Sequence, residues 1–262
     1  MKILILGCGS FAGQAYFSHC LAQGIDTYGI NRSKPKSQFY WPWIKEYDIN
    51  KRWYIHNLYS SPESIIERIN MIKPDKIVDF MGQGMVAQSW QDPSLWYQVN
   101  VTNKAKLLNS LVNSSYLQSY IRASTPEVYG SSNAPMTTDL GFNPSTPYAV
   151  SHAAIDAHIR CLGRQYDFPY FIARFANFYG VGQQLYRVIP RLIISALTST
   201  TFTLDGGGSS LRSFIYSSDI CSAIDSLPSS PRNTKEYHFS GNEKKSLFYV
   251  RQFFYQVLTK KL

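Results

Sequence analysis

Short apolar runs alternate with longer amphipathic segments along the first two thirds of the chain. Five of these runs have the length and composition of buried strands: Lys2–Leu6, Thr27–Ile30, Asp75–Phe80, Leu117–Ala123 and Tyr170–Arg174. Helical patterns separate them: one that follows Gly13 and runs to about Gln23, and others at Ser61–Ile72, Leu95–Val112 and Tyr148–Tyr166. Because strands that alternate with helices build a parallel sheet covered on both faces, the pattern predicts an α/β, doubly wound fold.

The pattern loosens after Asn177. A helix at Ile189–Leu197, a strand at Thr201–Leu204 and a final helix at Leu247–Leu258 are expected there. We therefore predict one domain over residues 1–176 and a small α/β lobe over residues 177–262, with residues 213–227 returning to the first domain.

Composition and charge narrow the class of protein. Hydrophobic residues make up 44% and charged residues 16% of the 262 residues, which is typical of a globular protein. The formal charge of +9 comes from dispersed lysines and arginines without a run of five, so no nucleic-acid partner is expected. Such a surface favours the approach of an anionic substrate.

The four cysteines are scattered and have no metal-ligand spacing, which predicts no metal site and a reduced, cytoplasmic setting. No apolar run is long enough to span a membrane. The first apolar run ends in a glycine-rich turn after Leu6, so it predicts a buried strand and not a signal peptide.

A glycine-rich turn joins the first strand to the first helix, with the pattern Gly7-x-Gly9-x-x-x-Gly13. A tight turn, a bare backbone and a helix N-terminus together bind the pyrophosphate of a dinucleotide. The turn therefore predicts a Rossmann-type fold. The expected cofactor-binding residues of this turn are Gly7, Ser10, Phe11, Ala12 and Gly13.

The end of the second strand normally distinguishes NAD from NADP. An acidic residue there binds the ribose 2′-hydroxyl, whereas a basic residue accepts a 2′-phosphate. The segment here is Asn31-Arg32-Ser33-Lys34, in which a neutral amide takes the acidic position and phosphate-binding groups follow. We expect NADP, with NAD as the alternative.

Tyr148 and His152 are four residues apart in a predicted helix, so both reach the same ligand. Ser124–Gly130 follows the strand that ends at Ala123 and therefore lies at the carboxyl edge of the sheet, where α/β folds bind ligands. These two segments mark the predicted site.

With these motifs in place, the chain resembles the extended short-chain dehydrogenase/reductase family, in its NAD(P)-dependent nucleotide-sugar epimerase/dehydratase branch and closest to 4,6-dehydratases acting on dTDP-glucose or GDP-mannose. The segments that carry the resemblance are Gly7–Gly13, Gly82–Trp90, Asn100–Thr102, Ser124–Gly130, Pro144–Tyr148, Arg174–Gly180 and Asp205–Asp219.

The resemblance implies roles for four residues. Tyr148 would take the proton from the sugar O4, and Thr125 would hydrogen-bond that oxygen. Glu127 would take the C5 proton. His152 stands where the family has a lysine that lowers the tyrosine pKa and binds the nicotinamide ribose. Between Thr125 and Glu127 the chain has Pro126, which offers no proton donor.

The resemblance also implies a nucleotide-diphosphate hexose as substrate, a homodimer built on the helix after Asp92 and the helix with Tyr148, and a place in carbohydrate biosynthesis. Gln83, Tyr148 and His152 would also bind the cofactor. The substrate-binding residues would be Gln88, Asn177, Gln183, Arg187 and Arg212. Family members usually extend beyond the last predicted helix, so the lobe is expected to be either compact or incomplete.

Two alternatives to 4,6-dehydration stay open at this point. Pro126 favours a 4-epimerase or a 4-keto reductase, which oxidises C4 but eliminates no water. His152 and Pro126 also motivate a protein of another class: a catalytically weak sensor or partner subunit that binds a dinucleotide or a sugar nucleotide.

Overall fold

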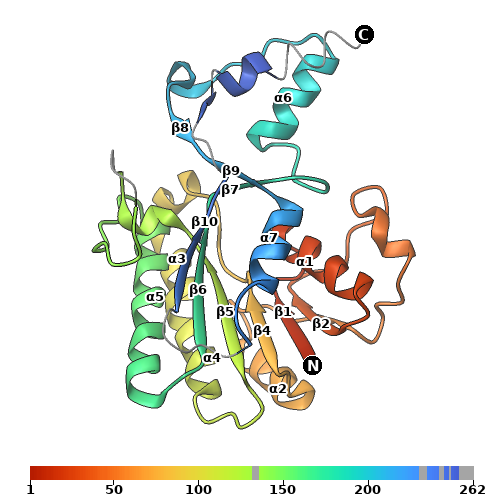
Figure 1. Ribbon diagram of the computed structural model, residues 1–262, viewed down its shortest axis with the longest axis vertical. Helices are drawn as coiled ribbons and strands as arrows, with labels where there is room; N and C mark the ends of the chain where they lie inside the picture. The colour runs from red at the N-terminus through yellow and green to blue at the C-terminus, as the bar shows by residue number, and fades with distance from the viewer. Residues whose placement is uncertain (132–135, 230–234, 242–244, 248, 254–262) are drawn as a thin grey trace.

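The computed structural model describes residues 1–131, 136–229, 235–241, 245–247 and 249–253. Its centre is a seven-stranded parallel sheet with the order β10-β6-β5-β4-β1-β2-β3 (Figure 1). The strands are β1 Lys2–Leu6, β2 Asp26–Asn31, β3 Trp53–Ile55, β4 Lys76–Asp79, β5 Ser119–Ser124, β6 Tyr170–Phe175 and β10 Glu236–Phe239. The predicted Rossmann-type doubly wound fold is confirmed.

The strand order reverses at β1. Leu6 pairs with Ile30 of β2 on one side and with Asp79 of β4 on the other. Successive strands then extend the sheet outward in both directions. The carboxyl ends of β1 and β4 therefore form the switch point at which doubly wound sheets bind ligands.

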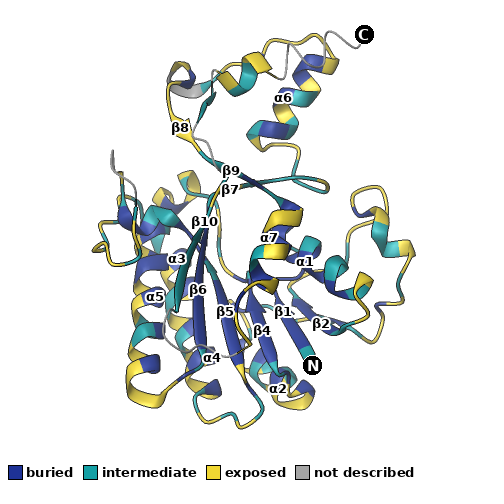
Figure 2. Ribbon diagram, in the orientation of Figure 1, coloured by how far each residue is buried: buried dark blue, intermediate teal, exposed yellow. Residues whose placement is uncertain are grey.

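Helices cover both faces of the sheet (Figure 1). Alternate strand residues face opposite sides, so Ile3 and Ile5 pack with α1 Phe11–Ala22 and α7 Ser217–Asp225. Leu4 and Leu6 pack with the other helical layer. That layer contains α2 Pro62–Ile72, α4 Lys104–Leu111 and α5 Pro147–Tyr166. The central strands β1, β4, β5 and β6 are consequently buried on both faces over most of their length (Figure 2).

The helix predicted at Leu95–Val112 is divided. It consists of α3 Pro93–Tyr97, a π-helical turn η3 Gln98–Asn103, and α4. Two asparagine side chains of the π turn bond outside the helix: Asn103 donates to the carbonyl oxygens of Leu58 and Tyr59, and Asn100 bonds the loop after β4. Such π turns are frequent at functional sites.

A smaller lobe lies beyond the carboxyl ends of the parallel strands (Figure 1). It contains α6 Val188–Leu197 and the antiparallel pair β8 Leu211–Arg212 and β11 Lys245–Ser246. The parallel pair β7 Asn177–Tyr179 and β9 Phe214–Tyr216 connects it to the sheet domain. The division into two domains stays a prediction.

Two expectations for this region and one missed element need comment. The strand predicted at Thr201–Leu204 is wrong: these residues pair with no described strand and lead into the 3₁₀ turn η5 Asp205–Gly208. Residue 248 and residues 254–258 of the predicted last helix lie outside the described residues. Strand β10 was missed, because its half-buried residues lack the apolar run of a central strand.

Three further 3₁₀ turns complete the described elements: η1 Pro42–Lys45, η2 Ala87–Trp90 and η4 Pro126–Tyr129. No helix among the described residues is long and apolar enough to cross a membrane.

Candidate active site

The glycine-rich turn between β1 and α1 is closed by its own backbone. Gly7 has φ of 74° and donates its N–H to the Ile30 carbonyl oxygen at 2.8 Å. A Cβ on Gly13 would collide with the Gly7 carbonyl oxygen, and one on Gly9 would collide with the Asn31 side chain. At Gly13 only glycine fits, and at Gly9 a larger residue would displace the Asn31 side chain. The turn therefore keeps the bare backbone at a helix N-terminus that a pyrophosphate requires.

Ser10 caps α1, because its Oγ accepts the N–H of Gly13 at 3.0 Å. Phe11 and Ala12 are buried in the core, so any contribution to the cofactor would come from their backbone. These residues fit the dinucleotide turn that the sequence predicts.

At the end of β2, the Asn31 amide donates to the carbonyl oxygen and the hydroxyl of Ser33, at 3.2 and 3.0 Å. Arg32 and Ser33 are exposed beside it. The amide therefore fixes a turn that presents a guanidinium and a hydroxyl at the position where an acidic residue would select NAD.

Asn100 clamps the loop after β4 to helix α5. Its Oδ1 accepts the N–H of Gln83 at 2.6 Å, and its Nδ2 donates to the Gln83 carbonyl oxygen and to Ser151 Oγ, both at 3.0 Å. Gln83 is thus held at the switch point. Gln88 lies exposed on η2.

The start of α5 presents the tyrosine and the histidine on one face. Thr146 caps the helix by accepting the N–H of Ala149, and Pro147 takes the first turn, where it loses no hydrogen bond. The rings of Tyr148 and His152 lie one turn apart, with centroids 4.5 Å apart.

Thr125 and Glu127 lie beside Tyr148. Burial is the main cause that raises the Tyr148 pKa to about 12, and the Glu127 carboxylate adds to it. A hydrogen bond with Thr125 and the charges of Arg122 and Arg187 act in the opposite direction. The structure therefore brings the four predicted catalytic residues together, with Thr125, Glu127 and His152 beside the Tyr148 phenol.

Glu127 is poorly solvated. Burial raises the pKa of its carboxyl, and the nearby Arg212 partly opposes this. A carboxyl with a raised pKa exchanges protons closer to neutral pH, as a general base or acid needs to do.

His152 is buried and neutral. Its Nδ1 lies 3.2 Å from Nη2 of Arg122, and a guanidinium can only donate. Burial, Arg122 and Lys104 hold its pKa well below the usual range. The charge of His152, open at the level of the sequence, is therefore absent at neutral pH.

Arg122 is the residue that sequence reasoning missed. It lies on β5, two residues before Ser124, and is 1% exposed. A charged residue within an apolar strand was the available signal, because an arginine is almost never fully buried without partners.

The predicted substrate-binding residues of the lobe are mostly exposed. The Asn177 amide donates to the Ser213 carbonyl oxygen, and the Gln183 amide donates to that of Phe178. Arg187, at the start of α6, and Arg212, in β8, are exposed but near enough to affect the pKa of Tyr148 and Glu127, respectively. The lobe therefore places two cations near the candidate catalytic residues.

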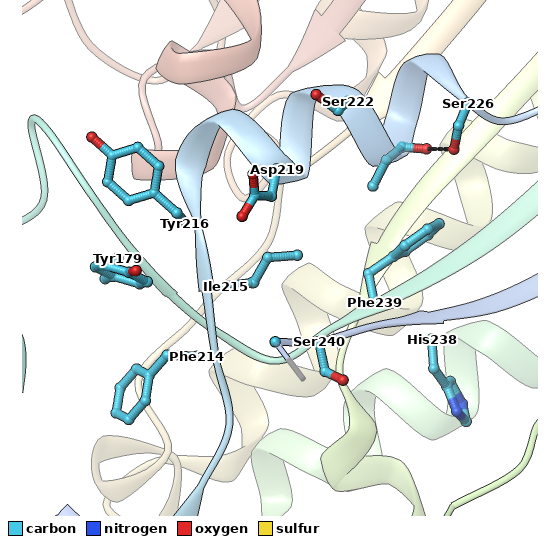
Figure 3. Close-up of a pocket in the computed structure, with 12 residues that line it drawn as sticks. Tyr179, Phe214, Ile215, Tyr216, Asp219, Ser222, Ser226, His238, Phe239 and Ser240 are labelled. Atoms are coloured by element: carbon cyan, nitrogen blue, oxygen red, sulfur yellow. Dashed lines mark hydrogen bonds between the residues drawn. The ribbon is translucent and has the colours of Figure 1, made fainter. Parts of the chain in front are cut away.

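A hollow of about 690 Å³ lies elsewhere, between α7 and the strands β9 and β10 (Figure 3). Asp219 and Ser222 line it from α7, and His238 and Phe239 line it from β10. None of its described lining residues is an arginine or a lysine, so it does not suit a diphosphate. Within the described residues, no cluster of His, Cys, Asp or Glu is arranged to hold a metal.

The fold, the glycine-rich turn and the candidate residues Thr125, Glu127 and Tyr148 together are typical of the short-chain dehydrogenase/reductase type. The sequence pattern of the NAD dependent epimerase/dehydratase family matches residues 3–239. The chain belongs to this family. A dTDP-glucose 4,6-dehydratase of Xanthomonas campestris is 27% identical over 192 residues, which are 69% of this chain and 54% of that protein. The chain thus matches about half the length of this relative.

Solved structures show the same fold. A UDP-glucose 4-epimerase from Thermotoga maritima, determined with UDP-glucose, matches 99% of this chain and 83% of its own length at a TM-score of 0.85 and 18% identity. A dTDP-glucose 4,6-dehydratase from Streptomyces venezuelae, determined with NAD bound, matches 99% and 81% at a TM-score of 0.85 and 23% identity. Epimerases and dehydratases share this architecture.

Proposed function

We propose that this protein is an NAD(P)-dependent nucleotide-diphosphate-hexose 4,6-dehydratase. The observation that carries the proposal is the juxtaposition of Thr125, Glu127 and Tyr148, each of which matches a family position for one step of that reaction. Retention of a carboxyl at Glu127 favours elimination, since a reaction confined to C4 needs no base at C5.

Gly7, Ser10, Gly13 and Gln83 would hold the cofactor, together with the backbone of Phe11 and Ala12. When bound, the nicotinamide would accept hydride from C4 and return it to C6, and the proton that O4 loses balances the one that C5 regains as the hydride returns. Tyr148, in the ionised form that Arg122 and Arg187 favour, would take the O4 proton while Thr125 hydrogen-bonds that oxygen. His152 would donate a hydrogen bond to the nicotinamide ribose.

Glu127 then takes the C5 proton, which the new C4 carbonyl acidifies. The C6 hydroxyl leaves with a proton as water, and the electron pair of the C5–H bond forms the C5–C6 double bond. Pro126 has no group to protonate the leaving hydroxyl. Burial raises the pKa of Glu127, so the proton that it has taken from C5 stays available for that hydroxyl.

Arg187 and Arg212 would bind the diphosphate of the substrate, assisted by Asn177, Gln183 and Gln88. We propose NADP as the cofactor, because Asn31 removes the acidic group and Arg32 and Ser33 are exposed beside it. NAD, which the related solved dehydratase binds, is the alternative.

A 4-epimerase or 4-keto reductase is the second candidate, and Pro126 is the observation that favours it. A sensor or partner subunit is the candidate from another class, and the neutral His152 favours it. A homodimer through the helix after Asp92 and α5, and a cytoplasmic location, stay predictions.

Mass spectrometry after incubation with a panel of nucleotide hexoses and both cofactors tests the proposal. The expected result is one substrate that loses the mass of one water. A product of unchanged mass but altered C4 configuration, seen by NMR, would establish the epimerase. Bound cofactor with no change in any sugar would support the sensor.

A further inference from the structure

A chain of buried charged residues extends beneath the candidate site, from Asp79 on β4 to Arg174 on β6. Lys104 donates to both carboxylate oxygens of Asp79, at 2.8 and 2.6 Å. Arg174 donates to Asp156 at 2.8 Å, and Ser124 Oγ donates to the same oxygen at 2.7 Å. Both carboxylates therefore have close partners of their own.

Arg122 lies between these two carboxylates but bonds neither. Its Nη1 is 3.8 Å from Asp79 and its Nε is 4.0 Å from Asp156, both beyond hydrogen-bond distance. Nε has no hydrogen-bond partner in the described part of the chain. The hydrogen bond that the guanidinium does make there, at 3.2 Å, is to His152.

This bond determines which nitrogen of His152 carries the proton. The guanidinium has five N–H donors and no acceptor, so Nδ1 must receive the bond and be unprotonated. The ring proton of the neutral imidazole is then on Nε2, the nitrogen that remains for a ligand.

The same contact supplies positive charge. A lysine at position 152 would carry a cation to the site, whereas neutral His152 carries none. The guanidinium of Arg122 places a fixed cation against the opposite edge of the imidazole, where it polarises the Nε2–H bond. Its charge also favours the ionised form of Tyr148.

We infer that Arg122 is a positioning residue that lets His152 act where the family has a lysine. It holds the imidazole in the Nε2–H form and provides the cation at the Nδ1 edge of the ring. The inference rests on the proposed function for its catalytic meaning. Its structural part, the protonated nitrogen and its dependence on Arg122, can be tested whatever reaction the protein catalyses.

The decisive measurement is the tautomer of His152 by long-range ¹H–¹⁵N NMR on protein labelled at its five histidines. The variant His152→Gln assigns the signal by removing it. The expected result for the unaltered protein is one neutral ring with its proton on Nε2. A proton on Nδ1, or a charged ring at neutral pH, would overturn the inference.

The second part compares Arg122→Met with Arg174→Met, which removes a neighbouring buried guanidinium that does not bond His152. Arg122→Met is expected to give a mixture of the two tautomers, or to raise the pKa of His152 so that the ring stays charged up to a higher pH. The groups that face the ring are Arg122 on β5, Lys104 on α4 and Tyr148 on α5. An unchanged tautomer in folded Arg122→Met protein would overturn the inference.

Loss of folding is checked by thermal melting. If Arg122→Met does not fold, Arg122→Lys keeps the charge and shortens the side chain, and the tautomer is read there. A partial loss of the Nε2–H form is expected. The shorter lysine side chain cannot reach Nδ1 of His152. If the ring nevertheless stays fully in the Nε2–H form, the inference is contradicted.

A double-mutant cycle tests the catalytic meaning. Arg122→Met should lower kcat roughly tenfold or more, and the same change in the His152→Gln background should add little, because both act through one group. If the fold-losses in kcat of the two single variants multiply in the double variant, Arg122 acts independently of His152. If the tautomer result holds but no sugar is converted, the proposed function fails and the inference about His152 stands.

Discussion

The two sides of the candidate site are held in different ways. Thr125, Tyr148 and His152 belong to helices and turns packed on the sheet, where capping bonds and buried partners fix them. Arg187 and Arg212 lie on the lobe with exposed side chains. The sheet side therefore has the rigidity that chemistry demands, and the lobe side has the freedom to adapt to a substrate.

This difference explains on which side of the site a substitution leaves the neighbouring residues undisturbed. An exposed arginine can be exchanged without disturbing the interior. A lysine-to-histidine change on the sheet side has consequences for its neighbours, since it alters the charge of a buried region. Arg122, Lys104 and Asp79 form the setting in which a neutral imidazole is stable.

The largest effect is expected from the sheet side. Tyr148→Phe removes the hydroxyl that exchanges the O4 proton, so turnover should fall by about 10²–10⁴-fold, while cofactor affinity changes little. Steady-state kinetics and fluorescence titration with the reduced cofactor measure the two quantities. Turnover close to that of the unaltered protein would exclude Tyr148 as the base.

Glu127→Gln separates the elimination from the oxidation. Dehydration should fall by about 10²-fold or more, while oxidation at C4 continues and reduced nicotinamide accumulates, as seen by its absorbance. If elimination survives in this variant, the C5 base lies elsewhere.

The pH profile of the unaltered protein gives a related check on Glu127. A base acts in its ionised form, so activity should decline as pH falls through the pKa of this carboxyl. Burial raises that pKa, so the acid limb should lie above the usual range of a glutamate. A limb at or below the usual range would contradict the half-buried position of Glu127.

Much of the sheet side could be predicted from the sequence. The glycine turn, the carboxyl ends of the strands and the Tyr148–His152 spacing depend on local patterns, which the structure reproduces. The contact between Arg122 and His152 could not be predicted, because it joins a strand to a helix 30 positions away through side-chain geometry alone.

The lobe was predicted less well. Strand β10 is separated from its partner β6 by some 60 positions and is only half buried, so no periodicity marks it. The stretch at Thr201–Leu204 has strand-like composition, but it has no partner among the described strands and stays irregular. Local sequence patterns do not predict regions whose structure depends on partners far away in the chain.

On the lobe side, Arg212→Ala should raise the KM for the sugar nucleotide by about tenfold, since one charge-assisted hydrogen bond to a phosphate is lost. The acid limb of the pH profile should also move upward, because Arg212 opposes the raised pKa of Glu127. Arg191→Ala is the matched control: its guanidinium lies over the Phe202 ring on the same lobe. Equal effects of both changes would place the diphosphate elsewhere.

The smallest effect concerns cofactor choice. Arg32→Ala should weaken NADP by about tenfold and leave NAD nearly unchanged, because only NADP has the 2′-phosphate that an exposed guanidinium binds. Titration of both cofactors at two salt concentrations measures this, and the NADP preference should shrink as salt screens the charge. Lys36→Ala controls for general loss of positive charge, since Lys36 is in the same loop but lies over the Tyr40 ring. An equal loss for both cofactors would mean that Arg32 contacts the pyrophosphate, which NAD and NADP share. Any preference for NADP would then have to come from Asn31 and Ser33. Their amide and hydroxyl would bind a ribose hydroxyl as readily as a phosphate, so the proposed choice of NADP would lose its support.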